Sequence, residues 1–145
     1  MANVCDVAKY ILKKLGTITT MKLEKLAYYC QAWSLAWDEV PLFEEDFEAW
    51  ANGPVCPQLF AKHKGYFSVN VDLFRDMEDF KFTETQKATL DAVLDYYGDK
   101  EPQWLSELTH KERPWREARN GCAPGEFCNN IITKESMQEY YGGLS

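Results

Sequence analysis

The hydrophobic positions of the first forty residues follow the spacing of α-helices. Near the N-terminus an apolar side chain recurs every three or four positions, which predicts a helix over about residues 6–15 with Asn3 as its cap and Gly16 at its end. A stronger period predicts a second helix over about residues 21–37, with Thr20 at its N-cap. The buried face expected for this second helix consists of Leu23, Leu26, Ala27, Cys30, Trp33 and Trp37.

The period changes after Pro41, which interrupts the helical pattern. Residues 47–50 alternate between the two faces expected of a short strand. The tripeptide Asn52-Gly53-Pro54 predicts a turn, because glycine accepts a positive φ and proline fixes the direction of the chain. A third helix is expected over residues 57–64, followed by an irregular stretch over residues 66–82 with room for a short strand.

A capping box formed by Thr83 and Gln86 predicts the start of a fourth helix, and Gly98 predicts its end. Its expected buried face consists of Leu90, Val93, Leu94 and Tyr97.

Shorter elements follow towards the C-terminus. Pro102 and Pro114 each suit the first turn of a short helix. Residues 120–130 indicate a loop, and a last helix is expected after Thr133, ending before Gly142. The pattern therefore predicts a mainly α fold, a helical bundle with a small β element inserted between the second and third helices.

The size and composition of the chain fit this interpretation. The chain has 145 residues, 46% of them hydrophobic and 27% charged, which is typical of a globular protein with its own core. No linker or repeat divides it, so a single domain over residues 1–145 is expected. No apolar run reaches the length of about 18 residues that a membrane helix needs, so no membrane partner is expected.

Charge is distributed unevenly. The net charge is -7, which disfavours general affinity for nucleic acid. Residues 38–48 contain no basic residue, and their acidic side chains allow two interpretations: a solvated face, or a docking surface for a basic partner. The candidate acidic surface consists of Asp38, Glu39, Glu44, Glu45 and Asp46.

The five cysteines are expected to be free thiols in a reducing cytosol. Their number is odd and no secretion signal precedes them, so a cytoplasmic location is expected. Cys122 and Cys128 lie close in sequence, but their spacing does not match that of a structural zinc site. No metal or other cofactor is expected.

Catalytic chemistry has two candidate side chains. Cys56 precedes a predicted helix start, where a thiolate is favoured, and His110 lies beside charged residues that suit an acid–base group. A structural role is the favoured interpretation for both, because no known catalytic motif surrounds them. The chain is therefore expected not to be an enzyme, with a thiol enzyme as a lesser hypothesis.

A DNA-binding interpretation rests on the turn over residues 18–22, which joins two helices as in a helix-turn-helix. Lys22 and Lys25 then open the second helix. The aromatic residues that follow them suit packing more than base contacts. A transcriptional regulator of its own operon is thus the alternative function.

Three sequence blocks together resemble the Panacea, or SocA-like, antitoxin family, which includes phage-associated GepA-type proteins. The first block contains Lys22, Leu23, Lys25, Leu26, Tyr28, Tyr29, Gln31 and Trp33. The second contains Glu48, Trp50, Gly53, Pro54, Val55 and Pro57. The third contains Leu105, Leu108, Thr109, His110, Pro114 and Trp115. Arg113 departs from the family pattern, which has a small residue there, and the loop over residues 122–128 has no counterpart.

The resemblance implies a helical domain with a small β element and a function in neutralising a protein toxin. Two modes are implied: direct binding of the toxin, and its delivery to a AAA+ protease such as ClpXP. Most residues of the three blocks are expected to build the core and the turn, whereas the residues that select a partner are expected to be exposed.

Overall fold

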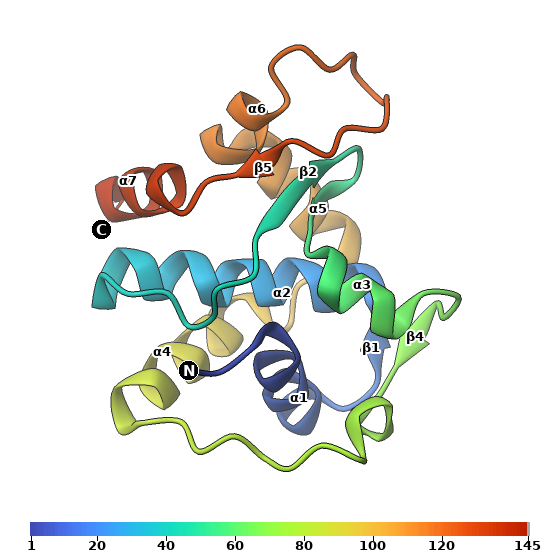
Figure 1. The fold of residues 1–145 in the computed structure, drawn as a ribbon, viewed down its shortest axis with the longest axis vertical. Helices are drawn as coiled ribbons and strands as arrows, with labels where there is room; N and C mark the ends of the chain where they lie inside the picture. Colours follow the sequence, from blue (N-terminus) through green and yellow to red (C-terminus); the bar gives the residue numbers. More distant parts are fainter. Residues whose placement is uncertain (145) are drawn as a thin grey trace.

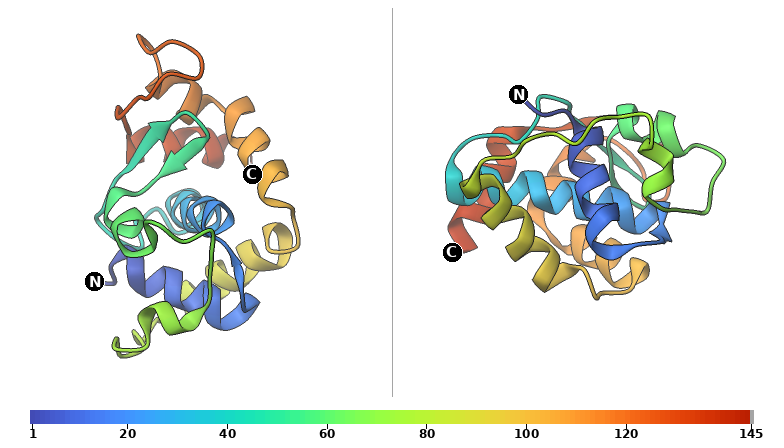
Figure 2. Two further views of the ribbon diagram at one scale, coloured as in Figure 1. Left: turned by 90° about the vertical axis from the view of Figure 1, so that its right-hand side faces the viewer. Right: turned by 90° about the horizontal axis from the view of Figure 1, so that it is seen from below.

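The computed structural model describes residues 1–144, and its elements surround one central helix. This helix, α2 (Thr20–Trp33), crosses the middle of the molecule in Figure 1. Helices α1 (Val4–Leu15) and α4 (Glu84–Tyr97) lie on one side of it, and β2 (Phe47–Trp50), α6 (Arg113–Ala118) and α7 (Lys134–Leu144) lie on the other. Figure 2 shows α2 nearly end-on between these two groups.

The sequence predicted one buried face for α2, and its central position explains why that prediction was only partly correct. Every residue from Leu23 to Ala32 is buried, so this helix has no solvent-facing side. The regular helix ends at Trp33 and continues as a π-helical turn, η1 (Ser34–Asp38), in which Trp37 is 46% exposed. Trp37 is therefore not part of the buried face.

The N-cap of α2 is Thr19 and not Thr20. Its side chain accepts a hydrogen bond from the backbone N–H of Lys22 at 3.1 Å. The shift has a tertiary cause, because strand β1 (Ile18–Thr19) pairs antiparallel with β4 (Ser68–Val69) and this pairing continues through a bond from Thr20 N to Phe67 O. The short strand expected within residues 66–82 is β4.

A second, three-stranded sheet contains the predicted β element. Strand β2 pairs with β3 (Gly53–Val55) in a hairpin with Trp50 opposite Gly53, which confirms the predicted strand. The chain reverses at residues 51 and 52, one position earlier than predicted, because Gly53 and Pro54 already pair with β2. The third strand, β5 (Ile131–Ile132), also pairs antiparallel with β2. The pattern did not predict β1 or β5, because two residues are too few to show a period of two.

Local signals placed several helix ends correctly. The capping box of Thr83 and Gln86 is present in α4, and Asn3 caps α1, although α1 begins two residues earlier than expected. The predicted end of α7 was wrong, since this helix continues through Gly142 to Leu144. Buried Met137 and Tyr141 anchor α7, which offsets the low helix propensity of glycine, about 1 kcal/mol per residue. The remaining helical elements are α3 (Pro57–His63), η2 (Val71–Phe74) and α5 (Pro102–Lys111).

These elements confirm the mainly α fold with a minor β component. Among residues 1–144, no helix is both long and apolar enough to cross a lipid bilayer.

Buried aromatic rings join α2 to α4 and α7. Tyr29 stacks on Tyr97 with ring centroids 4.2 Å apart, and Tyr28 packs edge-on against Tyr141. At the centre of this cluster Glu112, from the link between α5 and α6, accepts hydrogen bonds from the hydroxyls of Tyr29 and Tyr141, each at 2.7 Å. A buried carboxylate thus ties the link between α5 and α6 to two helices, α2 and α7.

The environment of Glu112 makes stability depend on pH. Burial raises the pKa of this carboxyl above its usual range, and the two tyrosine hydroxyls only partly oppose that shift. The folded state therefore holds the Glu112 proton more tightly than the unfolded state does. Its contribution to stability is complete below the ordinary carboxyl pKa and is lost as pH rises through the raised one.

We expect Glu112→Gln to remove this contribution. Urea unfolding of both proteins at several pH values between about 4 and 7 measures it. The free energy of unfolding of the wild type should fall relative to that of the variant as pH rises. Parallel pH profiles would contradict the assignment.

Candidate protein-binding groove

The three sequence blocks meet where the β2–β3 hairpin packs on the first half of α2. Lys25 Nζ donates a hydrogen bond to Pro54 O at 3.1 Å. From α5, Ser106 Oγ donates to Asn52 O at 2.6 Å, and Thr109 Oγ1 donates to Ser106 O at 2.7 Å. The hydrogen bonds from Lys25 in α2 and Ser106 in α5 thus fix the tip of the hairpin between two helices.

Gly53 occupies the tightest position in this arrangement. Its φ is 121°, as the predicted turn requires. A Cβ atom at this position would lie 2.6 Å from Lys25 Cε and 2.9 Å from Thr109 Oγ1. Only glycine allows the hairpin to approach α2 and α5 this closely.

A buried polar pair beside the hairpin was not predicted from the sequence. The Glu24 carboxylate accepts a hydrogen bond from the backbone N–H of Cys56 at 2.9 Å, and its other oxygen lies 2.7 Å from His63 Nε2. Both side chains are almost fully buried. The pair attaches α3 to α2, and no spacing in the sequence could have indicated it, because the partners are 39 positions apart.

Together these elements form a groove of about 340 Å³. Its walls include Trp50, Phe60 and Phe127, and the ring centroid of Trp50 lies 5.0 Å from that of Phe60 and 5.5 Å from that of Phe127. Trp50 is half-buried, so it is only partly a core residue, and Phe127 is 64% exposed. Exposed aromatic rings around an apolar hollow are typical of a protein-binding surface.

The groove continues along the start of α2. Thr20 and Met21 line both this groove and a second hollow, which is bordered by Phe67 and Pro102. Phe67 is 82% exposed. An exposed apolar surface therefore runs from the loop that carries Phe127 towards the loop that carries Phe67.

One wall of the groove belongs to a loop closed by a disulfide between Cys122 and Cys128. The expectation of free thiols is wrong for these two cysteines, because the loop brings their Cα atoms to 6.0 Å, within bridging range. Cys5, Cys30 and Cys56 are free and buried.

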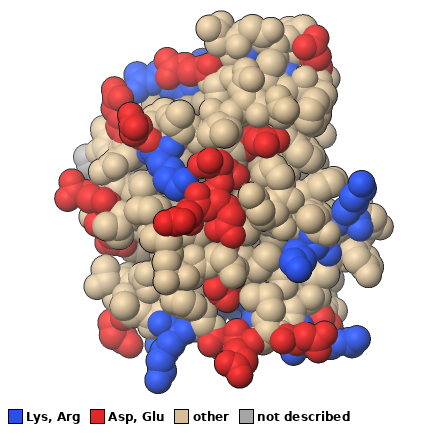
Figure 3. Space-filling view, viewed as in Figure 1, with Lys and Arg blue, Asp and Glu red and all other residues tan. Residues whose placement is uncertain are grey.

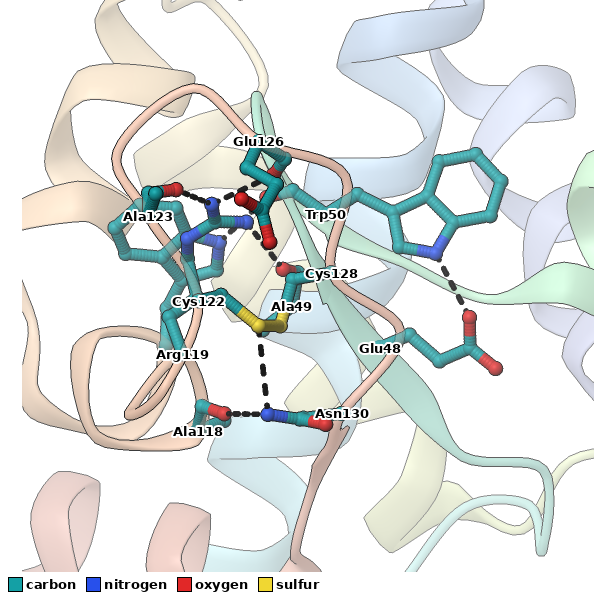
Figure 4. Close-up of a disulfide and its surroundings, with 11 residues drawn as sticks. Glu48, Ala49, Trp50, Ala118, Arg119, Cys122, Ala123, Glu126, Cys128 and Asn130 are labelled. Atoms are coloured by element: carbon teal, nitrogen blue, oxygen red, sulfur yellow. Dashed lines mark hydrogen bonds between the residues drawn. A yellow bond between two sulfur atoms is a disulfide. The ribbon is translucent and has the colours of Figure 1, made fainter.

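Arg119 organises the interior of this loop, as Figure 4 shows. Its guanidinium donates to the carbonyl oxygens of Ala123 at 2.8 Å and Glu126 at 2.7 Å, and to Ala49 O in strand β2 at 2.8 Å. Because the guanidinium bonds both the loop and the strand, the loop that carries Phe127 is held against the hairpin.

The two candidate catalytic side chains, Cys56 and His110, do not form a catalytic pair. Cys56 is buried, and burial raises the pKa of its thiol to about 12, which disfavours a thiolate at neutral pH. His110 stacks on Trp115 at 4.1 Å, and its pKa is lowered by burial and by nearby Lys25 and Arg119. Within residues 1–144 no hydrogen bond joins Cys56 to His110.

The candidate acidic surface is divided between two places. Asp38 accepts a hydrogen bond from Thr89 at 2.7 Å beside α4. Glu44, Glu45 and Asp46 instead line a hollow beside the N-terminus, where Asp46 pairs with Lys134 at 2.7 Å. Figure 3 shows one cluster of acidic side chains near the middle of the face in view and others around its edges. Part of their charge is compensated internally, and a docking role for them stays a prediction.

The helix-turn-helix interpretation requires α2 to be accessible. Lys25 is 2% exposed, and the helix that would enter the major groove is covered by other elements along ten consecutive residues. The structure therefore gives no exposed recognition helix at α2.

Comparison with known proteins gives one match. The family model described as antitoxin SocA-like, Panacea domain, matches residues 23–116. No curated protein and no solved structure matches the chain. The matched region includes the hairpin, α3, α5 and most of α2, whereas the disulfide loop and α7 follow it. Since the match covers more than half of the chain, this protein belongs to the SocA-like antitoxin family that carries the Panacea domain.

Proposed function

We propose that this protein is a non-enzymatic antitoxin that neutralises a cognate protein toxin by binding it directly at the aromatic groove. The family match over residues 23–116 carries the antitoxin role. The location is supported by exposed Phe127 and the half-buried rings of Trp50 and Phe60 beside the hairpin, because aromatic side chains around a hollow provide most of the energy in many protein interfaces.

Phe127→Ser tests the proposed location. The ring is 64% exposed, so its loss should leave the thermal unfolding midpoint nearly unchanged while lowering affinity for the toxin about tenfold or more. The toxin to use is the product of the neighbouring gene, measured by co-purification and by rescue of growth on co-expression.

Tyr96→Ser is the matched control. Tyr96 is 60% exposed but lies on α4, away from the groove, so this variant should bind the toxin like the wild type. If Phe127→Ser and Tyr96→Ser bound the toxin equally well, the interface would not lie at the groove. Failure of the wild type to bind and to rescue growth would refute the antitoxin role with this neighbour.

Direct binding leaves two fates for the toxin. It is either held in an inactive complex or delivered to a AAA+ protease such as ClpXP. The half-life of the toxin in cells with and without the protease distinguishes them. Shortening of that half-life by the antitoxin only when the protease is present would establish the adaptor mode.

A further inference from the structure

Lys25 forms the polar floor of the groove. Its side chain is 2% exposed and lines the hollow together with Trp50 and Val55. A lysine ammonium has three N–H donors, and Nζ donates one hydrogen bond, to Pro54 O. Within the described range 1–144, Nζ makes no second hydrogen bond, and no carboxylate lies within 4.0 Å of it.

The nearest acidic neighbour is already occupied. Glu24 precedes Lys25 in the helix and directs both of its oxygens elsewhere, to Cys56 N and to His63 Nε2. Glu24 also lines the groove and its charge favours the Lys25 ammonium, but among residues 1–144 no carboxylate is in salt-bridge contact with Nζ. Burial lowers the pKa of Lys25 to about 8 and nearby Glu24 partly opposes that shift, so most of the ammonium stays charged at neutral pH.

A buried charge with no carboxylate in contact carries a desolvation cost, and an incoming anion that pairs with it recovers part of that cost. The surroundings restrict the kind of anion. Trp50, Phe60 and Phe127 provide apolar walls, which favour a carboxylate that arrives beside an aromatic or branched aliphatic side chain.

The shape of the surface favours a side-chain carboxylate over a chain end. The groove and the hollow beside Phe67 share Thr20 and Met21 as lining residues, so the two hollows lie next to each other on the surface. An extended segment can pass through both, with one acidic side chain directed to the floor.

We propose that the groove binds an extended segment of the toxin in which a glutamate or aspartate stands beside an aromatic residue, and that this carboxylate pairs with Nζ of Lys25. The inference rests on the proposed function for the origin of the segment. The chemistry of the site is independent of which toxin provides it.

Two blocked tetrapeptides test the proposal without the toxin. Acetylated and amidated Phe-Glu-Leu-Phe is compared with Phe-Gln-Leu-Phe, which has the same shape without the charge. Binding is followed by the fluorescence of the protein and by NMR. The glutamate peptide should bind about fivefold or more tightly than the glutamine peptide. A third peptide, Phe-Gln-Leu-Phe with a free C-terminal carboxylate, shows whether a chain end replaces the side chain.

Lys25→Met should abolish the preference for glutamate while keeping the fold, because methionine has a similar length and no charge to bury. Lys25→Gln provides a second uncharged variant should methionine pack poorly. Lys22→Met, at a half-buried lysine one turn earlier, should leave the preference unchanged.

Equal affinity for the glutamate and glutamine peptides, no binding of either at millimolar concentration, or a preference that survives in both Lys25 variants would overturn the proposal. A free C-terminal carboxylate that binds more tightly than the glutamate side chain would also overturn it. Any of these results, combined with toxin binding that still depends on Phe127, would leave the proposed function standing.

Discussion

Gly53→Val is expected to lower the free energy of unfolding by about 4 kcal/mol. Its φ of 121° is a conformation that a β-branched residue avoids. The new side chain would also meet Lys25 Cε at 2.6 Å and Thr109 Oγ1 at 2.9 Å. Urea unfolding followed by tryptophan fluorescence measures the loss, since the hairpin carries Trp50.

Gly121→Val separates the two causes. Gly121 has a positive φ of 92°, but a Cβ atom there would meet nothing within 4 Å. This variant has backbone strain without the clash and should lose about 1–2 kcal/mol. Equal losses at the two glycines would show that the contact between the hairpin and α2 is not tight.

Tyr29→Ala is expected to cost about 5 kcal/mol, the second large effect. The Tyr29 side chain is fully buried, stacks on Tyr97 and donates a hydrogen bond to Glu112. Its removal leaves a cavity beside α4 and takes one of two hydroxyl donors from a buried carboxylate. Thermal and urea unfolding measure the loss.

Tyr29→Phe keeps the ring and removes only the hydroxyl, so it should cost about 2 kcal/mol. Tyr96→Ala, at a ring that is 60% exposed, should cost less than about 1 kcal/mol. If Tyr29→Phe lost as much free energy of unfolding as Tyr29→Ala, the stabilisation would come from the hydrogen bond and not from packing of the ring.

Features encoded by neighbouring residues could be predicted from the sequence. The N-cap at Asn3, the capping box at Thr83, the positive φ of Gly53 and the alternation in β2 each depend on a few adjacent positions. Features created by distant partners could not. The N-cap at Thr19 depends on pairing with residues 68–69, and that pairing has no local signal.

The groove, too, combines features that the sequence predicts with features that depend on distant partners. Trp50 and Lys25 belong to recognisable blocks, but nothing in those blocks indicates that the lysine is buried with a backbone carbonyl as its hydrogen-bond acceptor. Glu24 and His63 meet across 39 positions. Phe127 reaches the groove through a loop whose disulfide contradicts the expectation of free thiols.

The disulfide loop has a consequence for how this antitoxin can change its target. The loop closed by the Cys122–Cys128 disulfide starts just beyond α6, and a hydrogen bond from Arg119 to β2 holds it in place. Substitutions between the two cysteines therefore alter one side of the groove while the packing of the hairpin on α2 stays intact. The loop also follows the matched region, which ends at residue 116, so under the proposed function its substitutions would change toxin recognition without altering the three sequence blocks.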